Sequence, residues 1–302
     1  MKKLLFFVLL LAACGKNTSV SGPASPSPPL PPPPTNKPDT SFLTTAYVEV
    51  NNNSFHNPGC YIYGSKNKPV FTIAVIFAAN INSVNGKPAL YYNPQVQSTL
   101  NSGDVAYLRS QGIKVLLTVL GNHQNAGWGC FDNYNDADSF AIQCASAISS
   151  YGLDGIDIDD EYSACTTNNN SLVFALTALR ARLGPSKYIT KALFKDVQYF
   201  SAVYNGKKAG DILDFGWEMS YGNGDYAGRL RPYLQAGMSA GKLLVGVDIG
   251  GADQAAAASF VRQNGYAGLM TYNIGNGSQA ALSLVTNALF DTATGVRSGC
   301  LQ

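Results

Sequence analysis

The chain has 302 residues, of which 46% are hydrophobic and 13% are charged, and its formal net charge at pH 7 is +2. This length allows one large domain with a substantial hydrophobic core. So small a net charge does not favour nucleic acid as a partner, because nucleic-acid-binding proteins carry a strongly basic patch or stripe.

The first thirteen residues have the pattern of a secretory signal peptide. Lys2 and Lys3 precede an apolar run that is too short to span a bilayer. Residues 11–15, Leu-Ala-Ala-Cys-Gly, resemble a bacterial lipobox. We therefore predict a signal peptide at 1–13 and lipidation of Cys14, whose acyl chains anchor the protein stably. The expected localisation is that of an exported bacterial lipoprotein at the outer membrane, on the cell surface or on the periplasmic side.

A proline-rich segment follows this cysteine. Nine of the fifteen prolines lie between Ser21 and Pro38, and four of them are consecutive. Such a segment cannot bury a core and favours extended, polyproline-like conformations. We predict that residues 14–41 are a lipidated, semi-rigid spacer and that residues 42–302 form one catalytic domain. A ligand for a proline-recognition module is the alternative for the spacer.

From about residue 45 onward, strand-like apolar runs alternate with helical patterns. Eight parallel strands joined by helical crossovers are typical of a TIM (β/α)8 barrel, an α/β fold whose active sites lie at the carboxyl ends of the strands. We predict eight strands, near 45–50, 71–78, 113–120, 155–160, 188–194, 213–219, 243–248 and 268–273.

Several of the connecting helices have clear end signals. One has Pro94 in its first turn and Gly112 as its terminator. Two more end at Gly152 and Gly184 in the same way. These signals support the alternation of strands and helices that a barrel requires.

Two connections look different from the others. Residues 51–69 and 195–211 are rich in Asn, Gly and Tyr and have no helical period. We therefore expect the helices after strands one and five to be reduced to loops. Reduced coverage there leaves an open groove, which a bulky branched substrate needs.

Residues 151–162, Tyr-Gly-Leu-Asp-Gly-Ile-Asp-Ile-Asp-Asp-Glu-Tyr, are the most informative stretch. In a strand, alternate residues face opposite sides, so Asp157, Asp159 and Glu161 share one side and Ile156 and Ile158 the other. Three like charges on one side of a strand that helices cover cost free energy through repulsion and desolvation. This pattern favours a catalytic cluster over a solvated edge strand.

The spacing Asp154-x-x-Asp157-x-Asp159-x-Glu161 matches the DxxDxDxE signature of glycoside hydrolase family 18. The doubled acid before Glu161 and Tyr162 resembles the endo-β-N-acetylglucosaminidase branch of that family. The resemblance extends from about residue 46 to about residue 289 with a weaker middle, and it rests further on residues 46–54, 75–82, 111–124 and 269–273. It implies a retaining enzyme that hydrolyses the GlcNAc-β-1,4-GlcNAc core of N-linked glycans.

The resemblance also implies substrate-assisted catalysis, in which the sugar's own 2-acetamido carbonyl attacks the anomeric carbon and forms an oxazoline. Glu161, last on the strand, then suits the general acid. Asp159 suits the carboxylate that orients the acetamide N–H, and Asp157 can share a proton with Asp159 so that Glu161 stays protonated near neutral pH. Asp160 points the other way and is expected to be structural, and Asp154 is expected to be a scaffold hydrogen-bonder.

Residues 217–221, Trp-Glu-Met-Ser-Tyr, end the predicted sixth strand and resemble the family's MxY element. Tyr221 thereby inherits the role of donor to the acetamide carbonyl, and a packed core tyrosine is the alternative. Chitinases of the family usually carry Asp directly after this tyrosine. This chain has Gly222 there, which favours the endoglycosidase branch.

Further candidates for substrate binding lie after the third and eighth strands. Asn122, His123 and Trp128 follow the third strand, where a loop should line the groove, and Trp128 offers a stacking face with a polar N–H. Tyr272 and Asn273 close the eighth strand and are candidates for the floor of the site. A scaffold role for His123 and core packing for Tyr272 are the alternatives.

The sequence has no HExxH, no recognisable zinc spacing, no GxSxG and no P-loop, so we expect neither a metal nor a cofactor. Five cysteines follow Cys14, and this odd number leaves at least one unpaired in an oxidising compartment. Cys130 and Cys165 fall in loops after neighbouring strands and are the preferred pair.

Two other functions compete with the endo-β-N-acetylglucosaminidase. A chitinase of the same family would act on linear polymer, and a non-catalytic lipoprotein would only bind glycans, since family 18 barrels can serve as lectins. The intact Asp159 and Glu161 weigh against the lectin, because such proteins usually lose the acid. We expect a monomer whose partners are N-linked glycans and, through Cys14, the membrane.

Overall fold

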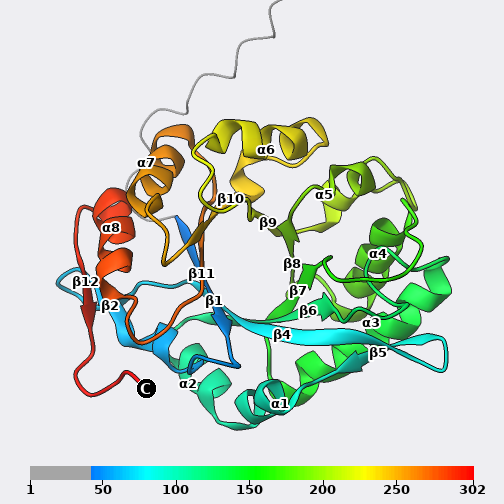
Figure 1. Ribbon diagram of the computed structural model, residues 1–302, viewed down its shortest axis with the longest axis horizontal. Coiled ribbons are helices and arrows are strands. Elements are labelled where there is room, and N and C mark those ends of the chain that lie inside the picture. The colour runs from blue at the N-terminus through cyan, green and yellow to red at the C-terminus, as the bar shows by residue number, and fades with distance from the viewer. Residues whose placement is uncertain (1–41) are drawn as a thin grey trace, which may run out of the picture. The chain divides into compact units, whose positions relative to one another are not determined.

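A computed structural model describes residues 42–302 of the chain. Eight parallel strands form a closed barrel, since β1 pairs with β4 on one side and with β11 on the other. The barrel strands are β1 (Leu43–Glu49), β4 (Ile73–Val84), β6 (Lys114–Gly121), β7 (Gly155–Asp159), β8 (Tyr188–Leu193), β9 (Phe215–Glu218), β10 (Leu243–Asp248) and β11 (Gly268–Tyr272). Figure 1 looks along the barrel, with the strands around the centre and the helices outside. The predicted TIM barrel and all eight predicted strands are confirmed.

Helices connect most of these strands on the outside. They are α1 (Pro94–Asn101), α2 (Asp104–Ser110), α3 (Tyr134–Tyr151), α4 (Ser171–Leu183), α5 (Ala209–Ile212), α6 (Tyr226–Gln235), α7 (Gln254–Asn264) and α8 (Gln279–Phe290), with short 3-10 helices η1 (Asn57–Cys60), η2 (Val197–Phe200) and η3 (Ala240–Lys242). The predicted helix ends at Gly152 and Gly184 are confirmed, and both glycines have positive φ. Across the described residues, each helix is too short or too polar for a bilayer span.

The barrel strands are buried on both faces, which explains their nearly continuous apolar sequences. Inside the barrel, Val75, Leu116, Trp217 and Met270 belong to one cluster of buried side chains. Between the strands and the helices lies a second, larger core. A polar residue that faces into the barrel is therefore surrounded by side chains of other strands, and near the carboxyl ends it lies where ligands bind.

The two reduced connections were predicted correctly. After β1 the chain forms η1 and two short strands, β2 (Tyr61–Tyr63) and β3 (Lys68–Pro69), and no α-helix. After β8 it forms η2 and α5, which is a single four-residue turn.

The connection after β4 differs from the prediction in two ways. First, β4 continues into a hairpin with antiparallel β5 (Lys87–Tyr91). The hairpin turn is Asn85-Gly86, with both residues at positive φ, a strong hairpin signal that was not used. Second, the predicted single helix is two helices, because the helical conformation is interrupted at Gly103, which has φ +91°. The Asn93 side chain caps the first of these helices, since its Oδ1 accepts from the Val96 amide at 2.8 Å.

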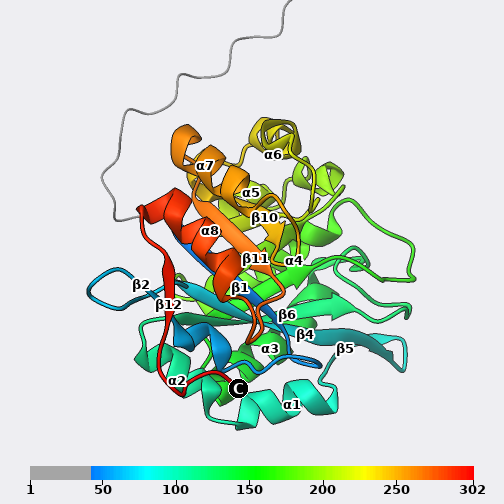
Figure 2. The ribbon, with the colours of Figure 1, turned by 60° about the vertical axis from the view of Figure 1, so that its left-hand side comes forward.

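A small sheet and two disulfides complete the domain. Strand β12 (Thr294–Val296) pairs with β2, and Figure 2 shows it beside α8. The Cys60–Cys300 disulfide ties the end of the chain to the connection after β1. Cys130 and Cys165 form the predicted pair, and Cys144 is the buried free cysteine that the odd count requires.

The predicted signal peptide at 1–13, the lipidated Cys14 and the spacer at 14–41 lie outside the described residues. These three assignments stay predictions.

Candidate active site

The acidic stretch forms β7, and its side chains alternate as predicted. Ile156 and Ile158 lie in the core between the barrel and the helices, with 0% exposure each. Asp157 and Asp159 face into the barrel and are 0% and 2% exposed. Glu161 lies just beyond the strand, at the carboxyl end where barrel enzymes place their active sites.

Asp157 is the centre of a hydrogen-bond network inside the barrel. Its carboxylate accepts from Thr118 Oγ1 at 2.8 Å, from Thr190 Oγ1 at 2.7 Å and from the Tyr47 hydroxyl. Trp217 Nε1 donates to the Tyr47 oxygen at 2.6 Å. Burial raises the pKa of Asp157 to about 6, although these hydrogen bonds favour the ionised form.

Sequence reasoning missed Tyr47, Thr118 and Thr190. The usable signal was their inward position by strand alternation on β1, β6 and β8. Within the described residues, the hydrogen bonds of Asp157 run to these hydroxyls and none runs to Asp159. The proton shared between Asp157 and Asp159 therefore stays a prediction.

Asp159 is buried, and one oxygen of its carboxylate makes no hydrogen bond to the protein. Its Oδ1 atom has no hydrogen-bond partner among the described residues. An unpaired buried polar atom costs about 1–3 kcal/mol, so such atoms are uncommon unless a ligand satisfies them. Burial raises the pKa of Asp159 well above its ordinary value, and the negative charges of Glu161 and Asp157 raise it further.

Glu161 is held at the mouth by a close approach of two strand ends. The Gly121 amide, at the end of β6, donates to the Glu161 carbonyl at 3.1 Å. A Cβ atom on Gly121 would lie 2.2 Å from that carbonyl oxygen, so only glycine fits there. The Glu161 side chain is partly exposed, and burial raises the pKa of its carboxyl group. A half-buried carboxyl with a raised pKa is suited to donate a proton.

Asp160 and Asp154, the two remaining acids of this stretch, make the structural hydrogen bonds that were predicted for them. Asp160 Oδ1 accepts from the Gly129 amide at 3.2 Å. Asp154 accepts from the Val115 amide at 3.0 Å and pairs with Arg109 at 3.1 Å. Both carboxylates therefore hold the backbone around β7 in place.

Tyr221 lies inside the barrel mouth. It packs with the inner cluster of which Trp217 is part, and its ring stacks on that of Tyr272 at 5.7 Å between centroids. Burial raises the pKa of the Tyr221 hydroxyl, and the charge of Asp159 raises it further, so the hydroxyl stays a hydrogen-bond donor. Burial of the Tyr272 hydroxyl, together with the negative charges of Glu49 and Asp248, raises its pKa to about 12.

The loop after β6 has two of its three candidates near the mouth. The His123 amide donates to the Tyr162 carbonyl at 2.6 Å, and the two rings lie 5.1 Å apart. The His123 side chain is exposed, and that of Tyr162 is 54% exposed. Asn122 Nδ2 donates to Asn82 Oδ1 at 2.7 Å, which ties the loop to the β4–β5 hairpin.

The third candidate, Trp128, was placed wrongly by sequence reasoning. It is 1% exposed, and its ring packs against Phe131 and Phe140. Its indole Nε1 donates to the Val119 carbonyl at 2.7 Å, so its polar group is also satisfied internally. The part of the loop that carries Trp128 packs against α3, so the Trp128 ring has no face open to a sugar.

Asn273 joins the last strand to the first. Its Oδ1 accepts from the Glu49 amide at 2.9 Å and from Asn53 Nδ2 at 3.2 Å, while its Nδ2 donates to Glu49 Oε2 at 3.2 Å. These bonds place Glu49, a further carboxylate, beside Tyr272 at the mouth.

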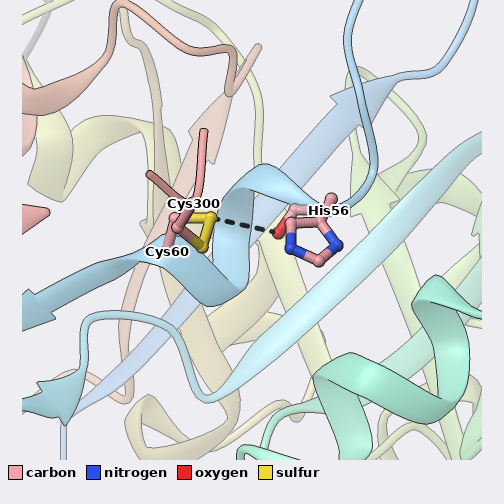
Figure 3. A group of neighbouring side chains, drawn as sticks. All are labelled: His56, Cys60 and Cys300. Atoms are coloured by element: carbon pink, nitrogen blue, oxygen red, sulfur yellow. Dashed lines mark hydrogen bonds between the residues drawn. A yellow bond between two sulfur atoms is a disulfide. The ribbon is translucent and has the colours of Figure 1, made fainter. Parts of the chain in front are cut away.

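One group among the described residues has ligand atoms spaced for a metal ion. The atoms of His56, Cys60 and Cys300 lie within 4.8 Å of one another. Figure 3 shows that the two sulfurs are joined in the disulfide. Disulfide sulfur is not a thiolate ligand. The His56 ring stacks on Tyr107 and is hydrogen-bonded to Asp104, so the group has a structural role and is not a metal site.

Comparison with known proteins identifies the family. Residues 40–257 match the family described as Glycosyl hydrolases family 18. The chain belongs to glycosyl hydrolase family 18. It is therefore a glycoside hydrolase, and the predicted family resemblance is confirmed.

Two curated relatives are named endo-beta-N-acetylglucosaminidases. The chain is 37% identical over 263 residues to the endo-beta-N-acetylglucosaminidase of Flavobacterium sp. (strain SK1022), with 82% of this chain and 80% of the relative covered. It is 26% identical over 249 residues to endo-beta-N-acetylglucosaminidase F1 of Elizabethkingia meningoseptica, with 78% of this chain and 73% of the relative covered.

Solved structures support the fold. Two structures of Bacteroides thetaiotamicron EndoBT-3987, one with a Man5GlcNAc product and one with a Man9GlcNAc2Asn substrate, match with TM-scores of 0.72 and 0.73. The identities are 23% and 22%, and 86% and 87% of this chain is covered. This chain spans 63% and 68% of those solved chains.

The burial of Trp128 leads to a first prediction. Trp128→Phe removes the hydrogen bond to Val119 and part of the packed volume, so the free energy of unfolding should fall by about 1–3 kcal/mol. The KM for a glycoside substrate should not change. Urea unfolding and steady-state kinetics on the same preparation check both results. A raised KM with unchanged stability would show that Trp128 contacts the substrate.

Proposed function

We propose that this family 18 hydrolase cleaves the GlcNAc-β-1,4-GlcNAc bond in the chitobiose core of N-linked glycans. The observation that carries the proposal is the row of carboxylates on β7: Asp157 is fixed by hydroxyl donors, Asp159 is buried with Oδ1 unpartnered, and Glu161 lies half-buried at the mouth. The 37% identical relative that is named an endo-beta-N-acetylglucosaminidase supports the substrate class.

In the proposed mechanism, the Glu161 carboxyl group protonates the oxygen of the leaving GlcNAc. The acetamide carbonyl oxygen attacks the anomeric carbon at the same time and forms an oxazoline. The Asp159 carboxylate accepts a hydrogen bond from the acetamide N–H, through the oxygen that lacks a protein partner. Glu161, now ionised, then removes a proton from water, which opens the oxazoline with overall retention.

Tyr221 donates a hydrogen bond to the acetamide carbonyl in this proposal. Its stacking on Tyr272 and the raised pKa of its hydroxyl support a fixed, protonated donor. Four other side chains near the mouth are proposed to contact the glycan: Asn122, His123, Tyr272 and Asn273.

The test is an incubation of residues 40–302 with a denatured high-mannose glycoprotein and, separately, with chitin oligomers. The proposal expects released glycan and a single GlcNAc left on each asparagine, both measured by mass spectrometry. Faster cleavage of chitin oligomers than of the glycoprotein would favour a chitinase. Binding to both substrates without cleavage of either would favour a lectin.

We also propose that Cys14 carries a lipid anchor, because the signal-like segment ends in Leu-Ala-Ala-Cys and a proline-rich spacer follows it. Cys14→Ser should release the protein from membranes or leave it unprocessed, since the acyl chains supply the membrane affinity. Membrane fractionation with mass analysis of the N-terminus checks this result. Unchanged fractionation of a variant whose signal is still cleaved contradicts the proposal.

A further inference from the structure

A buried lysine lies directly behind the carboxylates. Lys191 on β8 is opposite Ile158 of β7 in the strand register, and its neighbours Thr190 and Ala192 face into the barrel, so Lys191 faces out. Its side chain is 1% exposed although the group is charged. Burial of an ammonium group costs several kcal/mol unless it is paired, so this charge needs partners.

The partners come from two neighbouring segments. Lys191 Nζ pairs with Asp196 Oδ2 at 2.6 Å and donates to the Ala192 carbonyl at 2.9 Å. Asp196 lies in the connection after β8, and the Tyr233 hydroxyl of α6 donates to its Oδ1 at 2.7 Å. Asp160, at the end of β7, is a further negative group close to the ammonium.

One more charged pair lies on this side of the barrel. Glu218 of β9 is ion-paired with Arg229 of α6. The Glu218 charge also interacts electrostatically with the Tyr233 hydroxyl. Since Glu218 is neutralised by its own partner, the charge balance behind β7 is set by Lys191, Asp196 and Asp160.

We propose that Lys191 is a positioning residue of the reaction: its buried charge, held by Asp196, sets the pH at which Asp159, the orienting carboxylate, and Glu161, the acid, lose their protons. This inference rests on the proposed function in assigning those two roles. Lys191 faces away from the barrel interior, so it acts through the field that it exerts across one strand.

Electrostatics at the site agree with the geometry. Burial raises the pKa of Asp159 and of Glu161, and the positive charge of Lys191 opposes that rise at both groups. Burial also lowers the pKa of Lys191 itself, but the charges of Asp196 and Asp160 more than offset this, so the lysine stays protonated. Without it, both carboxyl groups would hold their protons to higher pH.

Two variants with opposite expected signs test the proposal. In Lys191→Met, the negative charges of Asp196 and Asp160 are left without the ammonium, so both limbs of the pH profile of kcat/KM should move to higher pH, by about one unit, the order of shift that a neighbouring charge produces. In Asp196→Asn, the ammonium loses its closest counter-charge, so both limbs should move to lower pH. The double variant should return towards the parent profile.

A second readout does not depend on catalysis. The chain has three glutamates, Glu49, Glu161 and Glu218, so glutamate labelled with carbon-13 at the carboxyl gives three NMR signals. The signal of the parent spectrum that is absent from the spectrum of Glu161→Gln belongs to Glu161. Its titration in the parent and in the two variants reports the shift directly, with Glu49 on β1, at the opposite side of the barrel, as the internal control.

Opposite shifts of the Glu161 titration in the two variants support the proposal. An unchanged titration, or a shift of the same sign in both, overturns it. A purely structural role would lower the unfolding midpoint and kcat without moving the titration. If Lys191→Met does not fold, the sign of the shift in Asp196→Asn decides. If the parent protein cleaves no glycan, the proposed function fails while the titration still measures the effect of Lys191.

Discussion

Glu161→Gln is expected to lower turnover on a denatured glycoprotein by roughly 10²–10⁴-fold or more, the loss typical for removal of a general acid. The amide keeps the shape of the side chain but cannot protonate the leaving oxygen. In the parent protein, activity should fall as pH rises through the raised pKa of Glu161, because the acid is then ionised. The variant should lose this dependence together with most of its activity.

Rates of glycan release, measured by mass spectrometry at several pH values, check this result. The partly exposed position of Glu161 predicts an unfolding midpoint close to that of the parent. Asp138→Asn on α3 is a matched control, since it also replaces a carboxylate by an amide but lies in an exposed ion pair with Arg182. Substantial activity of a folded Glu161→Gln variant contradicts the assignment.

Asp159→Asn should lower hydrolysis by about 10²–10³-fold, comparable to loss of one electrostatic donor in an active site. The variant cannot stabilise the acetamide through a carboxylate while the oxazoline forms. A supplied sugar oxazoline has already passed that step, and Glu161 is still present to activate an acceptor hydroxyl as general base. The variant should therefore transfer preformed oxazoline to a GlcNAc acceptor and hardly hydrolyse the product.

This result separates substrate-assisted catalysis from attack by an enzyme nucleophile. A nucleophilic Asp159 would form a glycosyl-enzyme, and its amide would fail in both reactions. Parallel assays of hydrolysis and oxazoline transfer, with Glu161→Gln as the control that should fail in both, distinguish the two mechanisms. A covalent adduct trapped on Asp159 of the parent protein, or no transfer by a folded Asp159→Asn variant, overturns the proposed mechanism.

Local sequence patterns were enough to predict the architecture and the row of acids. Strand alternation and helix periodicity are local properties, so eight strands, the helix ends at Gly152 and Gly184, and the inward direction of Asp157 and Asp159 could all be read from neighbouring residues. The absence of a helical period in two connections correctly predicted the reduced helices after β1 and β8.

The remaining features depend on contacts between residues far apart in the chain, which local patterns do not reveal. Tyr47 reaches Asp157 across 110 residues because β1 and β7 belong to one closed barrel. The loop position of Trp128 gave no sign that its ring packs into the core beside α3. Likewise, the burial of Lys191 depends on Asp196 and Tyr233, which other segments supply. Local patterns determine which way a side chain points, but its neighbours, and hence its charge state and role, depend on how distant strands pair.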